Sequence, residues 1–116
     1  MQDPMRNAAG PNQRTITVGG YPFEGPFNDT KYLENRPGLY AIHVQQDEDY
    51  TLLDVGESAA VQDRVRDHER KSCWMEHTHG GLIVFSVFYT PDLAEESRAA
   101  MSRLIRETTQ PACGEG

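Results

Sequence analysis

Three residues of types used in phosphate chemistry follow one another in the second third of the chain. Tyr40 lies in a strand-like run, and Arg64 and His68 lie in a segment of helical character. A tyrosine hydroxyl can move or orient a proton, and a guanidinium can neutralise charge that grows on a phosphoryl group. Because positions i and i+4 are neighbours on a helix, Arg64 and His68 are expected side by side.

Each of these side chains also has an ordinary structural interpretation. A strand tyrosine often packs in a core with its hydroxyl hydrogen-bonded, and a half-buried histidine often pairs with a backbone carbonyl. An arginine on a charged helix is often only solvated. Val61 and Val65 mark the buried side of this helix. From the residues alone, both interpretations stay open for Tyr40, Arg64 and His68.

Residues that bind metals occur nearby, but they form no standard motif. Asp54 precedes the Gly56 turn, where its carboxylate either contributes to a metal site or only ends a strand. Zinc takes Cys and His ligands at short intervals. Four such residues lie in one stretch: His68, Cys73, His77 and His79. Their spacing fits no zinc knuckle or finger, so zinc is not expected, and Cys73-Trp74 is interpreted as an apolar plug.

The elements that must position these residues follow from hydrophobic periodicity and turn residues. Strands are predicted at 14–18, 38–44, 50–55 and 82–89, with 38–55 forming an antiparallel hairpin. A packed loop is predicted at 21–37, with a helical turn near 31–34, and a helix at about 59–71 behind a Ser58 cap. The order predicts an α+β domain, in which a small antiparallel sheet of three to four strands packs against helices.

A last helix is predicted between Thr90-Pro91-Asp92 and Pro111, with Asp92 and Glu95 at capping-box spacing. Its buried face is predicted from helical periodicity. That face contains Leu93, Ser97, Ala100, Met101, Leu104, Ile105 and Thr108. Three segments result: a disordered tail at 1–13, an N-terminal extension with a short strand and a packed loop at 14–37, and a domain at 38–114.

Size and charge restrict the class of protein. The chain has 116 residues and a formal net charge of −7, which suits one polar domain. No apolar run approaches the roughly 20 residues of a membrane helix, and the N-terminus has no signal segment, so neither a membrane location nor export is expected. Two cysteines are expected to be reduced in a cytoplasmic protein. Acidic residues concentrate at 41–58, and the one weak basic concentration lies at 59–71.

The ordered set of features resembles the GIY-YIG nuclease domain. A triplet Gly38-Leu39-Tyr40 opens the hairpin, and a second, Asp54-Val55-Gly56, closes it. Arg64 comes eight residues after that glycine, followed by His68, a strand and an amphipathic helix. The resemblance implies hydrolysis of nucleic-acid phosphodiesters, with Tyr40, Arg64 and His68 as the candidate catalytic residues. Tyr40 would act as general base or orient the water, Arg64 would stabilise the developing charge, and His68 falls where the family commonly has a histidine or tyrosine. A glutamate of the last helix would hold one divalent metal, Mg or Mn.

The chain departs from the family pattern at three places. Asp54 stands where the second triplet has a tyrosine, and the metal glutamate would fall on Met101 or Ser102, neither of which is acidic. Cys113 stands where the family usually has asparagine. Asp54 is therefore the candidate metal ligand.

Three functions stay open at this stage. The first is a metal-dependent endonuclease with nucleic acid, DNA rather than RNA, as its partner and an unrecognised metal ligand. The second is a degenerate member that binds nucleic acid or another phosphate ligand through Tyr40, Arg64 and His68 with impaired or no catalysis. The third is a catalytically inactive protein-interaction module that uses the acidic hairpin and the Trp74 region. The absent glutamate and the net charge disfavour turnover, whereas the three retained residues disfavour a pure scaffold.

Overall fold

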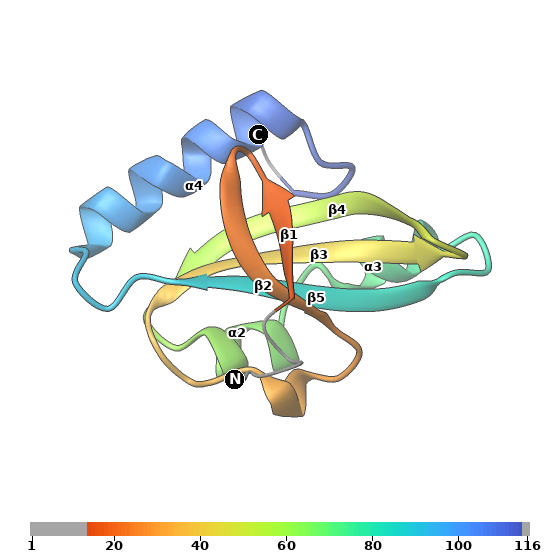
Figure 1. Cartoon of the computed structure of the whole chain (residues 1–116), viewed down its shortest axis with the longest axis horizontal. Coiled ribbons are helices and arrows are strands. Elements are labelled where there is room, and N and C mark those ends of the chain that lie inside the picture. Colours follow the sequence, from red (N-terminus) through yellow and green to blue (C-terminus); the bar gives the residue numbers. More distant parts are fainter. Residues whose placement is uncertain (1–13, 115–116) are drawn as a thin grey trace, which may run out of the picture.

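The computed structural model describes residues 14–114, and the predicted tail at 1–13 lies outside this range. In the described part, a curled antiparallel sheet has the strand order β1-β2-β5-β3-β4 (Figure 1). The strands are β1 (Thr15–Val18), β2 (Tyr21–Phe27), β3 (Gly38–Gln46), β4 (Asp49–Ser58) and β5 (Leu82–Tyr89). The α+β class is confirmed, but the sheet has five strands rather than three to four.

The additional strand is β2, in the segment predicted as a packed loop. Pro22 and Pro26 obscure it in the sequence because proline cannot donate to a ladder and is rare inside strands. All of β1 pairs with the first half of β2, and β2 reaches β5 only through Glu24 and Phe27, with an irregularity between them. Gly25 lies at that irregularity with φ +116°, a conformation that favours glycine. A 3-10 helix, η1 (Thr30–Tyr32), follows near the predicted helical turn.

The predicted hairpin is confirmed as β3 and β4, joined through Asp47 in the left-handed region at φ 56°. Because successive strand residues point to opposite faces, β3 contributes to two cores. Tyr40 and Ile42 pack with residues of two short helices on one face, and Leu39 and Ala41 pack with the last helix on the other. The β1-β2 hairpin curls onto that second face (Figure 1). Gly19 in its turn lies directly against the Ile105 side chain.

Of the helix predicted at about 59–71, only the short helix α2 (Val61–Arg66) forms, and a second short helix, α3 (Lys71–Glu76), begins where the predicted one ends. Ser58 does not cap α2, because Ala60 is the N-cap and the Ser58 hydroxyl accepts from the Ala60 amide instead. His68 lies in the break, and its Nδ1 accepts a hydrogen bond from the Arg70 amide at 3.1 Å. This local bond replaces a helical one, so Arg64 and His68 do not share one continuous helix as predicted.

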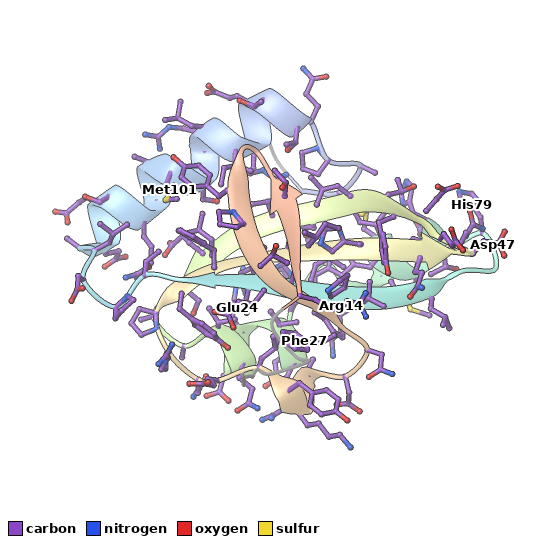
Figure 2. All side chains as sticks on the ribbon, in the orientation of Figure 1. Arg14, Glu24, Phe27, Asp47, His79 and Met101 are labelled. Carbon is purple, nitrogen blue, oxygen red and sulfur yellow. A yellow bond between two sulfur atoms is a disulfide. The ribbon has the colours of Figure 1, made fainter. Side chains whose placement is uncertain are left out.

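The last helix, α4 (Glu95–Thr109), begins later than predicted, with Ala94 rather than Asp92 as its N-cap. Its predicted buried face is also partly wrong. Leu104 is 62% exposed, and Met101 is partly buried against the core (Figure 2). The buried residues of α4 are Arg98, Ser102, Ile105 and Arg106. The helix is rotated because Arg98 and Arg106 pair with carboxylates of β4, an attraction that apolar periodicity does not register.

Cys73 and Cys113 form a disulfide, so the prediction of a reduced pair is wrong. The bond joins α3 to the segment that follows α4, across 40 residues of chain. Spacing could not predict the bond, because it depends on where α4 returns over the sheet. Among the described helices, none has the length and apolar character needed to cross a membrane.

Candidate functional site

A cleft of about 340 Å³ lies where α2, α4 and the end of β4 meet. Tyr40 lines it from β3 and Arg64 from α2, so the fold brings two of the three predicted catalytic residues to one surface. Arg70, Arg103 and Arg106 line the same cleft. Four guanidinium groups line the cleft around Tyr40, and three of them pair with the carboxylates of Asp54 or Glu69.

His68 lies behind the cleft and holds the Tyr40 hydroxyl. The Tyr40 Oη and His68 Nε2 atoms are 2.6 Å apart. His68 Nδ1 accepts from the Arg70 amide, so the neutral imidazole carries its proton on Nε2 and donates that proton to Tyr40. Burial, followed by the positive charges of Arg64 and Arg70, lowers the pKa of His68 to about 4. The neutral imidazole therefore leaves the Tyr40 proton available for another acceptor.

Tyr40 is nearly fully buried, and its hydroxyl reaches the cleft past Gly56. Any Cβ on Gly56 would collide with the Tyr40 hydroxyl, so the glycine makes room for that hydroxyl beside the cleft. Burial raises the pKa of Tyr40, although the charges of Arg64 and Arg70 oppose that shift. The phenol is therefore protonated at neutral pH. It can donate a hydrogen bond to a ligand oxygen, but it is a poor general base at this pH.

Arg64 is the accessible cation beside Tyr40. It makes a bidentate pair with Glu69, in which the Nη2 to Oε2 distance is 2.9 Å, and its side chain is 35% exposed. The hydrogen bonds from Arg64 lower the pKa of Glu69 to about 2, so the carboxylate stays charged. A planar carboxylate held by a guanidinium fork has the same hydrogen-bonding pattern as a bound phosphate oxygen pair.

Asp54, the predicted metal ligand, is buried, unlike the exposed carboxylate of Glu69. It is 0% exposed, and both carboxylate oxygens are occupied. Arg70 binds it through two nitrogens, Arg106 Nη1 lies 2.8 Å from Oδ1, and Trp74 Nε1 lies 2.8 Å from Oδ2. Burial alone would raise the pKa of Asp54, but hydrogen bonds from Arg70, Trp74 and Arg106 outweigh it and lower the pKa.

The cleft does not fit a divalent metal ion, which prefers several oxygen ligands. Ser102, not Met101, lines it at the helix position where the family resemblance places a glutamate. Glu57 is the carboxylate that lines the cleft, and it accepts a hydrogen bond from Arg98 at 2.8 Å. With Asp54 fully used and four arginines around the opening, the described residues repel a cation rather than bind one.

Sequence reasoning found Arg64 but missed the other arginines of the cleft and the partner of Trp74. Arg70 belongs to the weak basic segment at 59–71, and no feature of the last helix singled out Arg106. A buried aspartate needs a paired cation, and this rule is the one clue that could have indicated an arginine partner for Asp54. It does not say which cation, because Arg106 lies 52 residues from Asp54 in the sequence. Trp74 is buried, so its side chain does not form the predicted contact surface.

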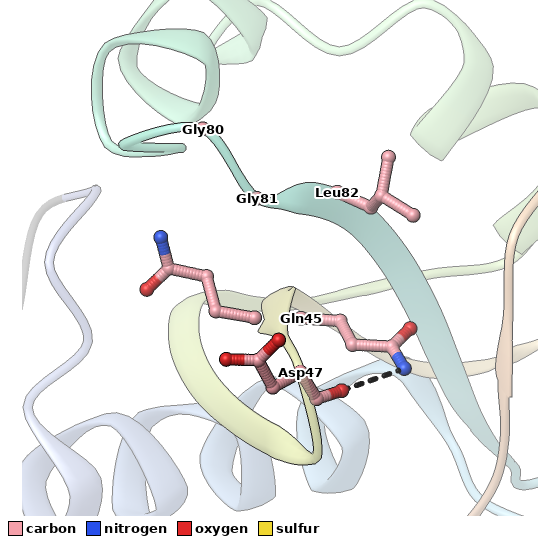
Figure 3. A pocket seen from close by; sticks show the side chains of 6 residues that line it. Gln45, Asp47, Gly80, Gly81 and Leu82 are labelled. Atoms are coloured by element: carbon pink, nitrogen blue, oxygen red, sulfur yellow. Dashed lines mark hydrogen bonds between the residues drawn. The ribbon is translucent and has the colours of Figure 1, made fainter.

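A larger hollow, of about 510 Å³, lies at the other end of the sheet, near the β3-β4 turn (Figure 3). Gln45 and Gln46 line it, together with Asp47 and the Gly80-Gly81 backbone. The Gln45 amide donates to the Asp47 carbonyl at 3.4 Å, as the dashed line shows. No guanidinium or imidazole lines this hollow among the described residues, so its chemistry offers less than that of the smaller cleft.

No family model matches the chain, and the comparisons with curated proteins and with solved structures gave no match either. The GIY-YIG resemblance therefore stays a prediction from the ordered residues. The geometry of the cleft is what bears on function.

Proposed function

We propose that the cleft between α2 and α4 binds a phosphodiester of nucleic acid, with DNA rather than RNA as the partner. One observation carries the proposal: the protonated Tyr40 hydroxyl and the Arg64 guanidinium line the same cleft. A hydroxyl donor and a planar fork of N–H groups together satisfy the oxygens of one phosphate. Exposed Arg103, on the facing helix, adds a cation for the same or the adjacent phosphate.

Binding requires an exchange of partners at Arg64. The arriving phosphate displaces Glu69, which is exposed and is held by Arg64 and, at 3.7 Å, by Arg70. Tyr40 then donates its proton to a phosphate oxygen while His68 Nε2 keeps the ring in place. Arg70 and Arg106 stay on Asp54 and fix the wall of the cleft. This division assigns ligand contact to Arg64 and Tyr40, and support to His68 and Asp54.

The same geometry supports binding better than turnover. Hydrolysis needs water activated by a base or a metal. Tyr40 is protonated at neutral pH, and Glu57 is paired with Arg98. The described residues of the cleft therefore orient a phosphodiester and neutralise its charge, but they lack an evident base. We therefore propose a nuclease-like protein that binds nucleic acid with impaired or no catalysis.

The test is the salt dependence of DNA binding, measured by fluorescence anisotropy with labelled single-stranded, duplex and branched DNA. Each neutralised phosphate contributes a slope of about 0.9 in log affinity against log salt. We expect a measurable slope, lowered by about one phosphate in Arg64→Ala. Arg66→Ala is the matched control, because Arg66 lies on the same helix and pairs with Asp63 outside the cleft.

A cleavage assay with Mg²⁺ or Mn²⁺ uses the same substrates and the same pair of variants. Nicking that needs the metal and disappears in Arg64→Ala would establish a nuclease and contradict the impaired-catalysis assignment. Absence of both binding and nicking would reject the phosphate proposal and leave the interaction module as the remaining function.

A further inference from the structure

A group of sulfur and imidazole ligands lies outside the cleft, where α3 meets the C-terminal segment. It consists of Cys73 and His77, one helical turn apart, and Cys113 after α4. Their candidate ligand atoms all lie within 4.8 Å of one another. His77 Nδ1 is 3.8 Å from the Sγ atoms of both Cys73 and Cys113. Three ligands from two segments therefore converge on one point.

This arrangement approaches the spacing of a tetrahedral zinc site. With Zn–S near 2.3 Å and Zn–N near 2.0–2.1 Å, ligand atoms that share one zinc lie about 3.5–3.8 Å apart. The two distances from His77 Nδ1 already fall at the edge of that range. The sulfur atoms have to separate to about 3.8 Å, which the disulfide prevents and its reduction permits.

The backbone around both cysteines is held by bonds other than the disulfide. The Cys113 amide donates to the Leu53 carbonyl at 2.7 Å, and Arg106 Nη2 donates to the Cys113 carbonyl at 2.8 Å. On the other side, Trp74 anchors α3 to Asp54 at 2.8 Å. Reduction therefore frees the two side chains without releasing either segment from the sheet.

We propose that reduction of the Cys73–Cys113 disulfide creates a zinc site formed by Cys73, His77 and Cys113, with water in the fourth position. A dithiol supplies two electrons and two protons to the S–S bond and is itself oxidised to a disulfide. Zn²⁺ then displaces one proton from each thiol. His77 moves its Nδ1 proton to Nε2, gives up its 2.8 Å bond to the Cys73 carbonyl and binds through Nδ1. The disulfide and zinc forms exclude each other.

The experiment uses the full chain, reduced with a dithiol, freed of the reductant without oxygen, and titrated with Co²⁺ as a spectroscopic substitute for Zn²⁺. We expect thiolate-to-cobalt charge transfer in the near ultraviolet, tetrahedral d–d bands in the visible, and loss of both when Zn²⁺ is added. The oxidised chain is expected to show neither signal. His77→Ala is expected to weaken Co²⁺ binding at least tenfold.

The matched control is His79→Ala, because His79 lies two residues from His77 and is not one of the three converging ligands. It is expected to bind Co²⁺ like the unchanged chain. Three results would overturn the proposal: no thiolate band in a reduced chain whose circular dichroism is native, equal binding by the oxidised chain, or equal losses in the two histidine variants. None of these results depends on phosphate binding at the cleft.

Discussion

Two arginine–carboxylate groups lie close together in this molecule and differ mainly in burial. Asp54 is fully buried and is held by Arg70, Arg106 and Trp74. Glu69 is exposed and is held by Arg64, and Arg70 Nη1 lies 3.7 Å from its Oε2, so Arg70 touches both groups. Removing one partner from a buried group leaves an uncompensated charge, whereas an exposed pair is readily replaced by water or another anion. The same chemistry therefore supports the fold at Asp54 and offers an exchangeable ligand position at Arg64.

The largest expected effect comes from breaking the buried group. Asp54→Ala leaves two arginines and the Trp74 N–H without their acceptor, so we expect a loss of about 3–5 kcal/mol in the free energy of unfolding. Urea denaturation followed by circular dichroism measures it. A loss no larger than that of an exposed-site variant would show that the buried cluster does not support the fold.

A second, smaller effect is expected where the cleft meets the core. Gly56→Ala places a methyl group against the Tyr40 hydroxyl, and overpacking of this kind costs about 1–3 kcal/mol. The variant should also bind DNA more weakly, because Tyr40 is displaced from the opening. Gly20→Ala is not a suitable control, because Gly20 has a positive φ of 90° and Gly56 does not. Tyr40→Phe serves as the comparison instead: it should lose DNA binding with less loss of stability.

Protonation of two buried histidines is expected to make the stability of the fold depend on pH. The folded-state pKa values of His43 and His68 are both lowered to about 4 from the ordinary 6.5, burial being the main cause. Between these values the unfolded chain binds protons that the folded chain does not, so stability falls as pH falls from about 6.5 to about 4. Denaturation midpoints across this range measure the slope, and His68→Gln should flatten part of it. An unchanged slope in that variant would contradict a neutral His68.

The smallest expected change in stability comes from the exposed pair. Glu69→Gln removes the charge that competes for Arg64 and leaves the buried cluster intact, so the unfolding free energy should change little. DNA affinity should rise, because the phosphate no longer displaces a charged partner. Anisotropy titrations at one fixed salt concentration check this, with Asp63→Asn, on the partner of Arg66, as the control. A fall in affinity would show that Glu69 assists binding instead.

The sequence predicts what depends on local pattern. Alternation and turn residues located β1, the β3-β4 hairpin and β5, and helical periodicity located α4. The order of Tyr40, Arg64 and His68 indicated residues that the fold does gather, although through a break between helices rather than by helical spacing. β2 was missed because its prolines and glycine resemble a loop.

What the sequence could not predict depends on distant pairing. The rotation of α4 follows from Arg98 and Arg106 reaching β4, and the disulfide follows from where Cys113 returns beside α3. No residue near Asp54 in the sequence indicates that its carboxylate is already paired with distant side chains. Asp54 was predicted to be a metal ligand. Within the proposed phosphate site its role is instead to hold Arg70 and Arg106 in the wall of the cleft.

The central claim is that Arg64 contacts phosphate, and one paired measurement tests it. DNA affinity is measured for Arg64→Ala and Arg66→Ala across roughly 50 to 200 mM salt, with circular dichroism confirming that both variants are folded. We predict weaker binding and a lower salt slope for Arg64→Ala, and an unchanged slope for Arg66→Ala. Equal slopes for the two variants, or no salt dependence in the unchanged chain, would contradict the account.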